Sequence, residues 1–266
     1  MTVLRRVALG TLILWLILPL VPLAIWSFAK GWRFPALLPN EFTLHAWHIA
    51  LSDRTGALHS LGLTAAIATL TTLIAVLIGV PAGRALGQHR FRGKAAIQAL
   101  ILAPLIVPGI AVGLGLHAVF LRLGLTNSIP GVVLVHLIPS LPYMILVMTG
   151  IFATHDPAFE WQARSLGATP WQTFRHITLP AILPGVIVGA LFCFLVSWSQ
   201  YILTLLIGGG RVQTLPLLLF SFATSGRNDL TGAIALIYIL PGILILVLTA
   251  RYISGTHPAL AGVSRT

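Results

Sequence analysis

Six apolar stretches divide this chain of 266 residues, and each is long enough to cross the hydrocarbon core of a bilayer. A spanning helix needs about 20 mostly apolar residues. The stretches are continuous rather than alternating, and in lipid only helices and closed barrels satisfy the backbone hydrogen bonds. We therefore predict an all-α fold, a polytopic bundle of six transmembrane helices. The predicted spans are residues 7–29, 59–80, 95–121, 131–151, 183–207 and 232–253.

The composition excludes the other broad classes of protein. Hydrophobic residues make up 57% of the chain and charged residues only 8%, whereas soluble domains carry about 25% charged residues. A soluble globular fold and intrinsic disorder are both excluded. The first stretch follows Arg5 and Arg6 as a signal peptide would, but it exceeds the about 7–15 apolar residues of such a peptide. We expect a retained helix and one membrane domain over residues 1–266.

The basic residues predict the orientation in the membrane. The net charge is +11, but these residues lie between apolar runs and form no basic stripe, so nucleic acid is not an expected partner. With the N-terminus inside, ten of the 16 Lys and Arg residues fall on the inner side, including the cluster from Arg84 to Lys94. The positive-inside rule then places both termini in the cytoplasm.

Three hydrophilic segments are long enough to have structure of their own. Residues 30–58 and 208–231 are predicted outside, and residues 152–182 inside. The apolar stretch Leu215–Phe222 in the second outer segment is too short to span. Small-residue pairs that allow close helix packing occur in three spans, and Pro104 and Pro108 are expected to kink the third span. These pairs are Gly79/Gly83, Gly109/Gly113 and Gly185/Gly189.

The sequence of residues 152–182, here called the coupling segment, predicts two short helices. The first ends at Gly167, which can adopt the left-handed conformation. Thr169 caps the second, with Pro170 at its first position and Gln172 completing a capping box. The second helix is expected to stop before Pro180. One face of it is predicted to carry Trp171, Phe174, Ile177 and Thr178. Such a segment is either a connector under the bundle or a docking element for a cytoplasmic partner.

The same segment resembles a known family. A glycine, nine residues, then Ile-x-Leu-Pro before the penultimate span is similar to the EAA loop of binding-protein-dependent ABC importer permeases. The resemblance implies the type I, MetI-like permease fold and a coupling helix that docks on an ATP-binding subunit. The residues it assigns to this loop are Glu160, Ala163, Gly167, Ala168, Trp171, Phe174, Ile177, Leu179 and Pro180.

One position departs from the family pattern. Trp161 stands where the family has the first glutamate of Glu-Ala-Ala, and Glu160 lies one place earlier. The ion pair of the motif glutamate is either lost here or made by Glu160. Near Gly208 the sequence is most similar to the spermidine/putrescine permease group, whose relatives handle polyamines, thiamine, phosphonates or ferric iron.

The resemblance also implies the partners. These are two ATP-binding subunits that hold ATP and Mg, a second permease subunit in a heterodimer, a periplasmic solute-binding protein and the lipid bilayer of a bacterial inner membrane. No cofactor is expected in this chain. The chain itself is not expected to be an enzyme, because it contains no Gly-x-x-x-x-Gly-Lys-Ser/Thr loop.

The acidic residues separate the transporter classes. All five are predicted in loops, whereas an ion-coupled transporter usually needs an intramembrane carboxylate. Two classes of protein remain: a transporter that takes its energy from another subunit and, as the alternative, an ATP-independent channel or facilitator. We interpret His45, His48 and His59 as isolated loop histidines rather than as a metal site. The predicted packing residues inside the membrane are His117, His136 and Cys193.

Polar side chains on the fifth span are candidates for the substrate pathway. Ser197, Gln200, Tyr201 and Thr204 are spaced i, i+3, i+4 and i+7, which places them on one face of a helix. They either make interhelical hydrogen bonds or line the pathway, where the resemblance places it. No acidic residue accompanies them, so this stretch does not support a dicationic solute.

Overall fold

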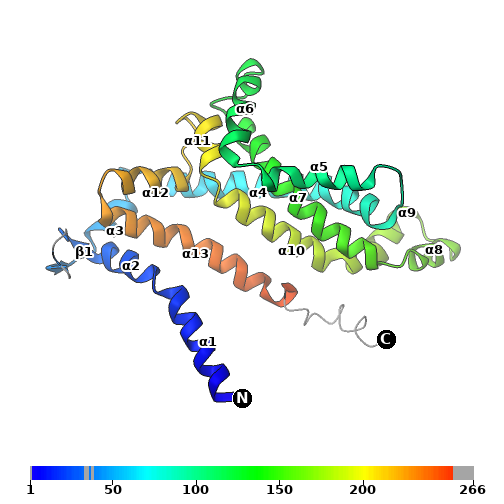
Figure 1. Cartoon of the computed structure of the whole chain (residues 1–266), viewed down its shortest axis with the longest axis horizontal. Coiled ribbons are helices and arrows are strands. Elements are labelled where there is room, and N and C mark those ends of the chain that lie inside the picture. Colours follow the sequence, from blue (N-terminus) through cyan, green and yellow to red (C-terminus); the bar gives the residue numbers. More distant parts are fainter. Residues whose placement is uncertain (1, 33–35, 37–38, 254–266) are drawn as a thin grey trace. The chain divides into compact units, whose positions relative to one another are not determined.

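The computed structural model describes residues 2–32, 36 and 39–253 (Figure 1). Their regular structure is helical except for a ribbon of two short antiparallel strands, β1 (Ala29–Lys30) and β2 (Glu41–Phe42). Arg33 and Arg265, two of the residues counted for the orientation, lie outside the described residues. The helices are α1 Thr2–Ile17, α2 Leu20–Phe28, α3 His45–Ala50, α4 Ala57–Gln88, α5 Lys94–Ile106, α6 Gly109–Arg122, α7 Ile129–Thr154, α8 Ala158–Ser165, α9 Pro170–Thr173, the π-helical turn η1 Phe174–Thr178, α10 Leu179–Trp198, α11 Ile202–Gly208, α12 Leu215–Thr224 and α13 Asn228–Ile253.

Among the described residues, four helices are long and apolar enough to span a membrane, and six spans result if two bent pairs each count as one. The first pair replaces the straight helix predicted over residues 7–29: α1 and α2 meet at 46°. The break lies at Pro19, which lacks the N–H that would continue the helical ladder. The all-α membrane fold is confirmed.

The second bent pair corrects the predicted kink in the third span. α5 and α6 meet at 102°, so residues 95–121 form two helices rather than one bent helix. Val107 is extended (φ −75°, ψ 130°), as the residue before a proline prefers to be, and Pro108 then precedes α6. Pro104, by contrast, lies inside α5 without ending it.

The described residues form two compact units. The first contains residues up to 63 and 213–242, and its core joins α3, the start of α4, α12 and α13. Ala50, Leu215 and Ile234 are fully buried there. The apolar stretch predicted as too short to span is the helix α12. Asp229, predicted in a loop, lies in the first turn of α13, because that helix begins before residue 232.

The second unit contains residues 64–212 and those from 243 onward, and α7 packs beside α10 at its centre (Figure 1). Its core includes Met144, Met148, Phe152 and Cys193. Cys193 is fully buried, as predicted for a packing residue, and its thiol donates to the Ser140 carbonyl at 3.2 Å.

The small-residue pairs act as predicted at two of three places. A side chain at Gly79 or Gly83 would collide with Met144 or Met148 of α7. Gly185 and Gly189 approach Ile151 and Met144 in the same way. In the third pair only Gly113 is in close contact, with Leu206 of α11, whereas Gly109 faces open space. The difference arises because Gly109 is the first residue of α6, after the break.

The predicted stop before Pro180 is wrong. α9, η1 and α10 form one span from Pro170 to Trp198. The Leu179 N–H bonds to the Phe174 carbonyl, an i→i+5 bond of the π-helical turn, and Pro180 occupies the first turn of α10. The wider ladder of this turn accommodates the proline, which has no N–H to donate.

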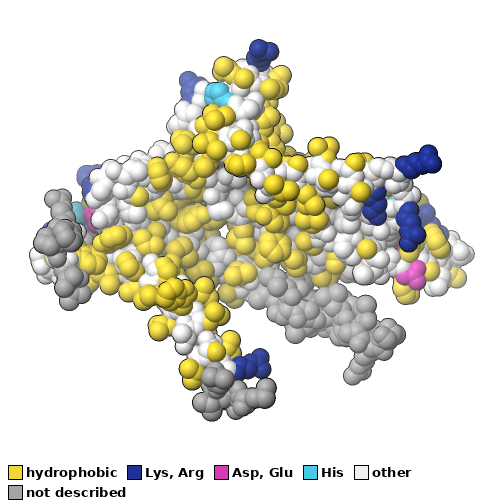
Figure 2. Space-filling view, viewed as in Figure 1, with side chains coloured by type: hydrophobic (Ala, Val, Ile, Leu, Met, Phe, Trp, Pro, Cys, Tyr) yellow, Lys and Arg dark blue, Asp and Glu magenta, His cyan; other side chains and the backbone are white. Residues whose placement is uncertain are grey.

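The surface of the second unit suits a lipid environment. Figure 2 shows hydrophobic side chains over α5 and α6, whereas Lys and Arg side chains lie near the tip of α6 and near α8. Ile106 and Leu100 are 82% and 74% exposed. A soluble protein rarely exposes so much contiguous apolar surface, and hydrocarbon accepts it without cost.

Candidate functional site

The local structure of the coupling segment is the predicted one. α8 ends before Gly167, which has a φ of +91°. Thr169 then begins α9 with a complete capping box: the Gln172 backbone N–H donates to the Thr169 hydroxyl at 3.3 Å, and the Thr169 N–H donates to the side-chain oxygen Oε1 of Gln172 at 2.8 Å. These reciprocal bonds satisfy two free N–H groups at the start of the helix.

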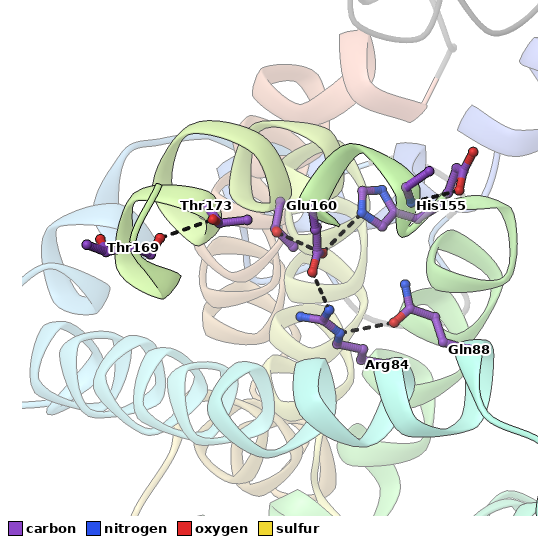
Figure 3. A network of polar contacts seen from close by, with 9 residues as sticks. Arg84, Gln88, His155, Glu160, Thr169 and Thr173 are labelled. Atoms are coloured by element: carbon purple, nitrogen blue, oxygen red, sulfur yellow. Dashed lines mark hydrogen bonds and ion pairs between the residues drawn. The ribbon is translucent and has the colours of Figure 1, made fainter. Parts of the chain in front are cut away.

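Glu160 joins α8 to another part of the same segment and to α4 of the second unit (Figure 3). Its carboxylate accepts from Arg84 Nη2 of α4 at 2.6 Å and from Thr178 Oγ1 of η1 at 2.9 Å. His155 Nε2, just after α7, lies 3.3 Å from Glu160 Oε1, the oxygen that Thr178 also contacts. The Glu160 side chain is only 5% exposed, whereas Arg84 is 38% exposed and also bonds to Gln88. The ion pair that the sequence left open is therefore made by Glu160.

The environment of Glu160 keeps it ionised. Desolvation by burial acts to raise the pKa of this carboxyl. The hydrogen bonds from Thr178 and Arg84, the Arg84 charge and the His155 contact act the other way and together hold the pKa below its usual value of 4.5. A buried carboxylate with three donors from three elements fixes α8 in place.

Large apolar side chains of the coupling segment are exposed. Trp161 is 65% exposed, Trp171 64% and Leu166 89%. The rings of Trp171 and Phe174 lie 5.8 Å apart, so these two share a face as predicted. Thr178 lines a hollow together with Phe174, but it is buried against Glu160. Ile177 and Ala163 line a separate hollow with Leu166.

The remaining residues assigned to the loop have varied surroundings. Ala168 and Leu179 are half-buried, and Gly167 and Pro180 are exposed. Sequence reasoning missed Arg84, His155 and Leu166. The sequence did contain a signal for Arg84. It is an arginine near the end of an apolar helix, and such a side chain needs a partner.

A cavity of about 550 Å³ lies in the membrane part of the second unit, where α5, α6, α7 and the end of α10 meet. Within the described part of the chain, none of the side chains that line it is charged. Its polar edge comes from Ser199, Gln200 and Tyr201. We call it the Gln200 cavity; its lining residues are Pro104, Leu105, Val107, Gly109, Val112, Ile138, Pro139, Tyr143, Val196, Ser199, Gln200, Tyr201, Ile202 and Leu203.

The predicted polar face of the fifth span is wrong as a helical face. α10 ends at Trp198 and α11 begins at Ile202, so the span predicted over residues 183–207 is broken. Gln200 and Tyr201 line the cavity, whereas Ser197 and Thr204 are buried at 2% and 0% exposure. The predicted interhelical hydrogen bonds are therefore made by Ser197 and Thr204, whereas Gln200 and Tyr201 lie at the cavity.

His136 of α7 joins the two buried members of the set. Its Nδ1 lies 2.8 Å from Ser197 Oγ, and its Nε2 lies 2.9 Å from Thr204 Oγ1. His117 Nδ1 lies 2.9 Å from the Leu206 carbonyl. His136 is a buried, hydrogen-bonded packing residue, as predicted, whereas His117 makes a hydrogen bond but is exposed. Among the described residues, no group of three His, Cys, Asp or Glu side chains could hold a metal ion.

Comparison with known proteins gives the class of this fold and site. Residues 75–255 match the family described as binding-protein-dependent transport system inner membrane component. The chain belongs to this family of multi-pass inner-membrane permeases, which are components of ABC importers and not themselves enzymes.

Individual relatives differ in what they carry. The chain is 30% identical over 260 residues to the molybdenum transport system permease protein ModB of Mycobacterium tuberculosis, covering 92% of each chain. It is 26% identical to the spermidine/putrescine transport system permease protein PotC of Haemophilus influenzae, covering 92% of this chain and 95% of that one. A solved bacterial ABC transporter of alginate import matches with a TM-score of 0.70 at 20% identity, over 94% of this chain and 95% of that one.

Proposed function

We propose that this chain is one of two permease subunits of an ATP-driven importer for a small polar solute. Two ATP-binding subunits hold ATP and Mg, and one of them docks on the coupling segment of this chain. A periplasmic solute-binding protein delivers the solute. Both termini lie in the cytoplasm. The family match supports the importer class, and an ATP-independent channel is not favoured.

The observation that carries this proposal is the combination of a fixed backbone and exposed apolar side chains in the coupling segment. The buried Glu160 holds the segment in place, whereas Trp161, Leu166 and Trp171 are exposed. Large exposed apolar side chains on a rigidly held helix are typical of a protein interface. The Arg84–Glu160 contact also brings the end of α4, next to the basic cluster, to the coupling segment. This agrees with a cytoplasmic position for both.

The Gln200 cavity supports a solute that is polar and not strongly cationic. Its described lining offers hydroxyl and amide groups but no carboxylate. A polyamine such as that carried by PotC would leave its charges unpaired there, which is costly in a low-dielectric site. The lining offers an oxyanion no opposite charge either, but its amide N–H and hydroxyl groups can donate hydrogen bonds to one. The similarity to ModB therefore makes a molybdenum oxyanion the first solute to test.

The experiment is reconstitution. The tagged chain is co-expressed with its candidate permease and ATP-binding partners, purified in mild detergent and placed in vesicles with a solute-binding protein. We expect co-purification of an ATP-binding subunit and uptake that requires ATP. Uptake at full rate without ATP, or a chain that never retains an ATP-binding subunit, would contradict the proposal.

A pair of variants sharpens the docking part of this test. Leu166→Glu places a charge among the exposed apolar side chains of the coupling segment and should abolish retention of the ATP-binding subunit. Leu123→Glu is the control, because Leu123 is 64% exposed but follows α6, away from the coupling segment. Equal retention in both variants would contradict docking at Leu166.

A further inference from the structure

The break between α10 and α11 has an unusual relation to the residues around it. In an unbroken helix, Ser197, Gln200 and Thr204 would share one face, because residues three, four and seven apart lie above one another. Ser197 and Thr204 do face α7, where both contact His136. Gln200 instead lines the cavity. The three non-helical residues from Ser199 to Tyr201 therefore place Gln200 at the cavity rather than beside His136.

The hydrogen bonds across the break can be assigned a direction. The Thr204 hydroxyl donates to the Gln200 carbonyl at 2.8 Å. A hydroxyl has one hydrogen, so Thr204 Oγ1 accepts from His136 Nε2–H. The neutral ring then has Nδ1 as its acceptor, and the Ser197 hydroxyl donates to it. The chain of donors runs from Ser197 through His136 and Thr204 to the backbone of Gln200.

Each member of this chain is enclosed by protein. His136 is 1% exposed, Ser197 2% and Thr204 0%. A buried polar group left without its partner costs free energy, so the arrangement that satisfies all three is favoured over others. His136 bonds to Ser197, one residue before the end of α10, and to Thr204, within α11. It therefore contacts both sides of the break. In a continuous helix residues 197 and 204 would lie about 10.5 Å apart along the axis, farther than one imidazole ring with hydrogen bonds of 2.8 and 2.9 Å can bridge. These bonds therefore favour the broken form over a continuous helix.

We propose that His136 is a positioning residue of the translocation pathway: by bonding Ser197 and Thr204 on either side of the break, it holds Gln200 and Tyr201 at the cavity. The role of the cavity as the pathway rests on the proposed function. His136 itself does not line the cavity.

Thiol labelling tests this inference without a known solute. Cys193 is the only cysteine of the chain and is fully buried, so a cysteine introduced at Gln200 reports on that position. The whole permease complex is treated in detergent with a water-soluble, positively charged methanethiosulfonate reagent, and the rate of labelling is measured. Val112→Cys is the matched control, because Val112 lines the same cavity from α6.

We expect Gln200→Cys to react in the otherwise unchanged chain. Adding Thr204→Val or His136→Leu should slow the reaction at least about tenfold, the change expected when about one buried hydrogen bond no longer favours one arrangement. His136→Gln should restore the rate, because glutamine carries both an acceptor and a donor. The rate at Val112→Cys should stay the same in every background.

Three results would overturn the inference. One is an unreactive Gln200→Cys in the otherwise unchanged chain. Another is an unchanged Gln200→Cys rate in the Thr204→Val background, which decides the matter even if His136→Leu does not accumulate, because valine matches threonine in shape. The third is an equal loss of rate at Val112→Cys, which indicates general disruption. Failure of ATP-dependent uptake would instead count against the proposed function.

Discussion

Arg84 and Glu160 lie 76 positions apart in the chain, yet the Arg84 guanidinium donates to the Glu160 carboxylate at 2.6 Å. The contact joins the end of a membrane-spanning helix to a short helix of the coupling segment. Thr178 adds a third element through the same carboxylate. One acidic side chain thus holds together three segments that share no local sequence pattern.

Removal of Arg84 should be costly because it leaves that carboxylate buried with weaker donors. We expect Arg84→Met to lower the free energy of unfolding by about 1–3 kcal/mol. Denaturant titration in detergent measures this, and adding Glu160→Gln should recover part of the loss. The control is Lys30→Met: the Lys30–Glu41 pair at 3.2 Å is more than half exposed, so its loss should cost about 0–1 kcal/mol. Equal losses for Arg84→Met and Lys30→Met would contradict this.

Acid should weaken the same contact. Because the pKa of Glu160 is lower in the folded chain than its usual 4.5, ionised Glu160 stabilises the fold above pH 4.5. This contribution falls as the pH drops from 4.5 through the lower folded pKa. The melting temperature of the unmodified chain should therefore exceed that of Glu160→Gln at neutral pH and approach it in acid. A difference that widens below pH 4.5 would refute the assignment.

Gly167 should be sensitive to any side chain through its backbone alone. A β-carbon at this position would meet no atom within 4 Å, but the φ of +91° strains residues other than glycine. We expect Gly167→Asn to lose least, then Gly167→Ala at about 1–2 kcal/mol, and Gly167→Pro most. Retention of the ATP-binding subunit should fall in that order while helix content by circular dichroism stays constant. Gly150→Ala, also in open space but within α7, is the control. Full retention by Gly167→Pro would contradict docking here.

Gly83 should be sensitive for the opposite reason, because its space is occupied. A β-carbon there would collide with Met148 and lie 2.9 Å from its backbone carbonyl carbon. We expect Gly83→Ala to destabilise by about 1–3 kcal/mol, measured by unfolding in detergent, with Gly150→Ala again as control. Unchanged stability in Gly83→Ala would show that α4 and α7 separate more easily than their packing indicates.

Local patterns predicted local structure well. The capping box at Thr169 and the left-handed turn at Gly167 depend on neighbours within a few residues, and both are present. The apolar runs also predicted the membrane class, since run length and hydrophobicity decide whether a helix spans. The continuation through Pro180 was missed because a π-helical turn leaves no mark in residue type.

Features set by distant contacts could not be predicted. The break at Ser199–Tyr201 lies within an apolar run, and His136, which bonds to both of its sides, is 61 and 68 positions away from its two partners. The partner of Glu160 is equally remote. The spacing of the polar residues in the fifth span does not indicate which helix packs against them. The shifted position of Glu160 does not indicate its partner either.

The continuity of Pro170–Trp198 has a mechanical consequence. These 29 residues form one helical stretch without a loop, about 44 Å long at 1.5 Å per residue. Under the proposed function this stretch is a lever that starts beside Trp171 in the coupling segment and stops at the break next to Gln200. Because no loop interrupts it, a push on the coupling segment would be carried to the joint at the cavity.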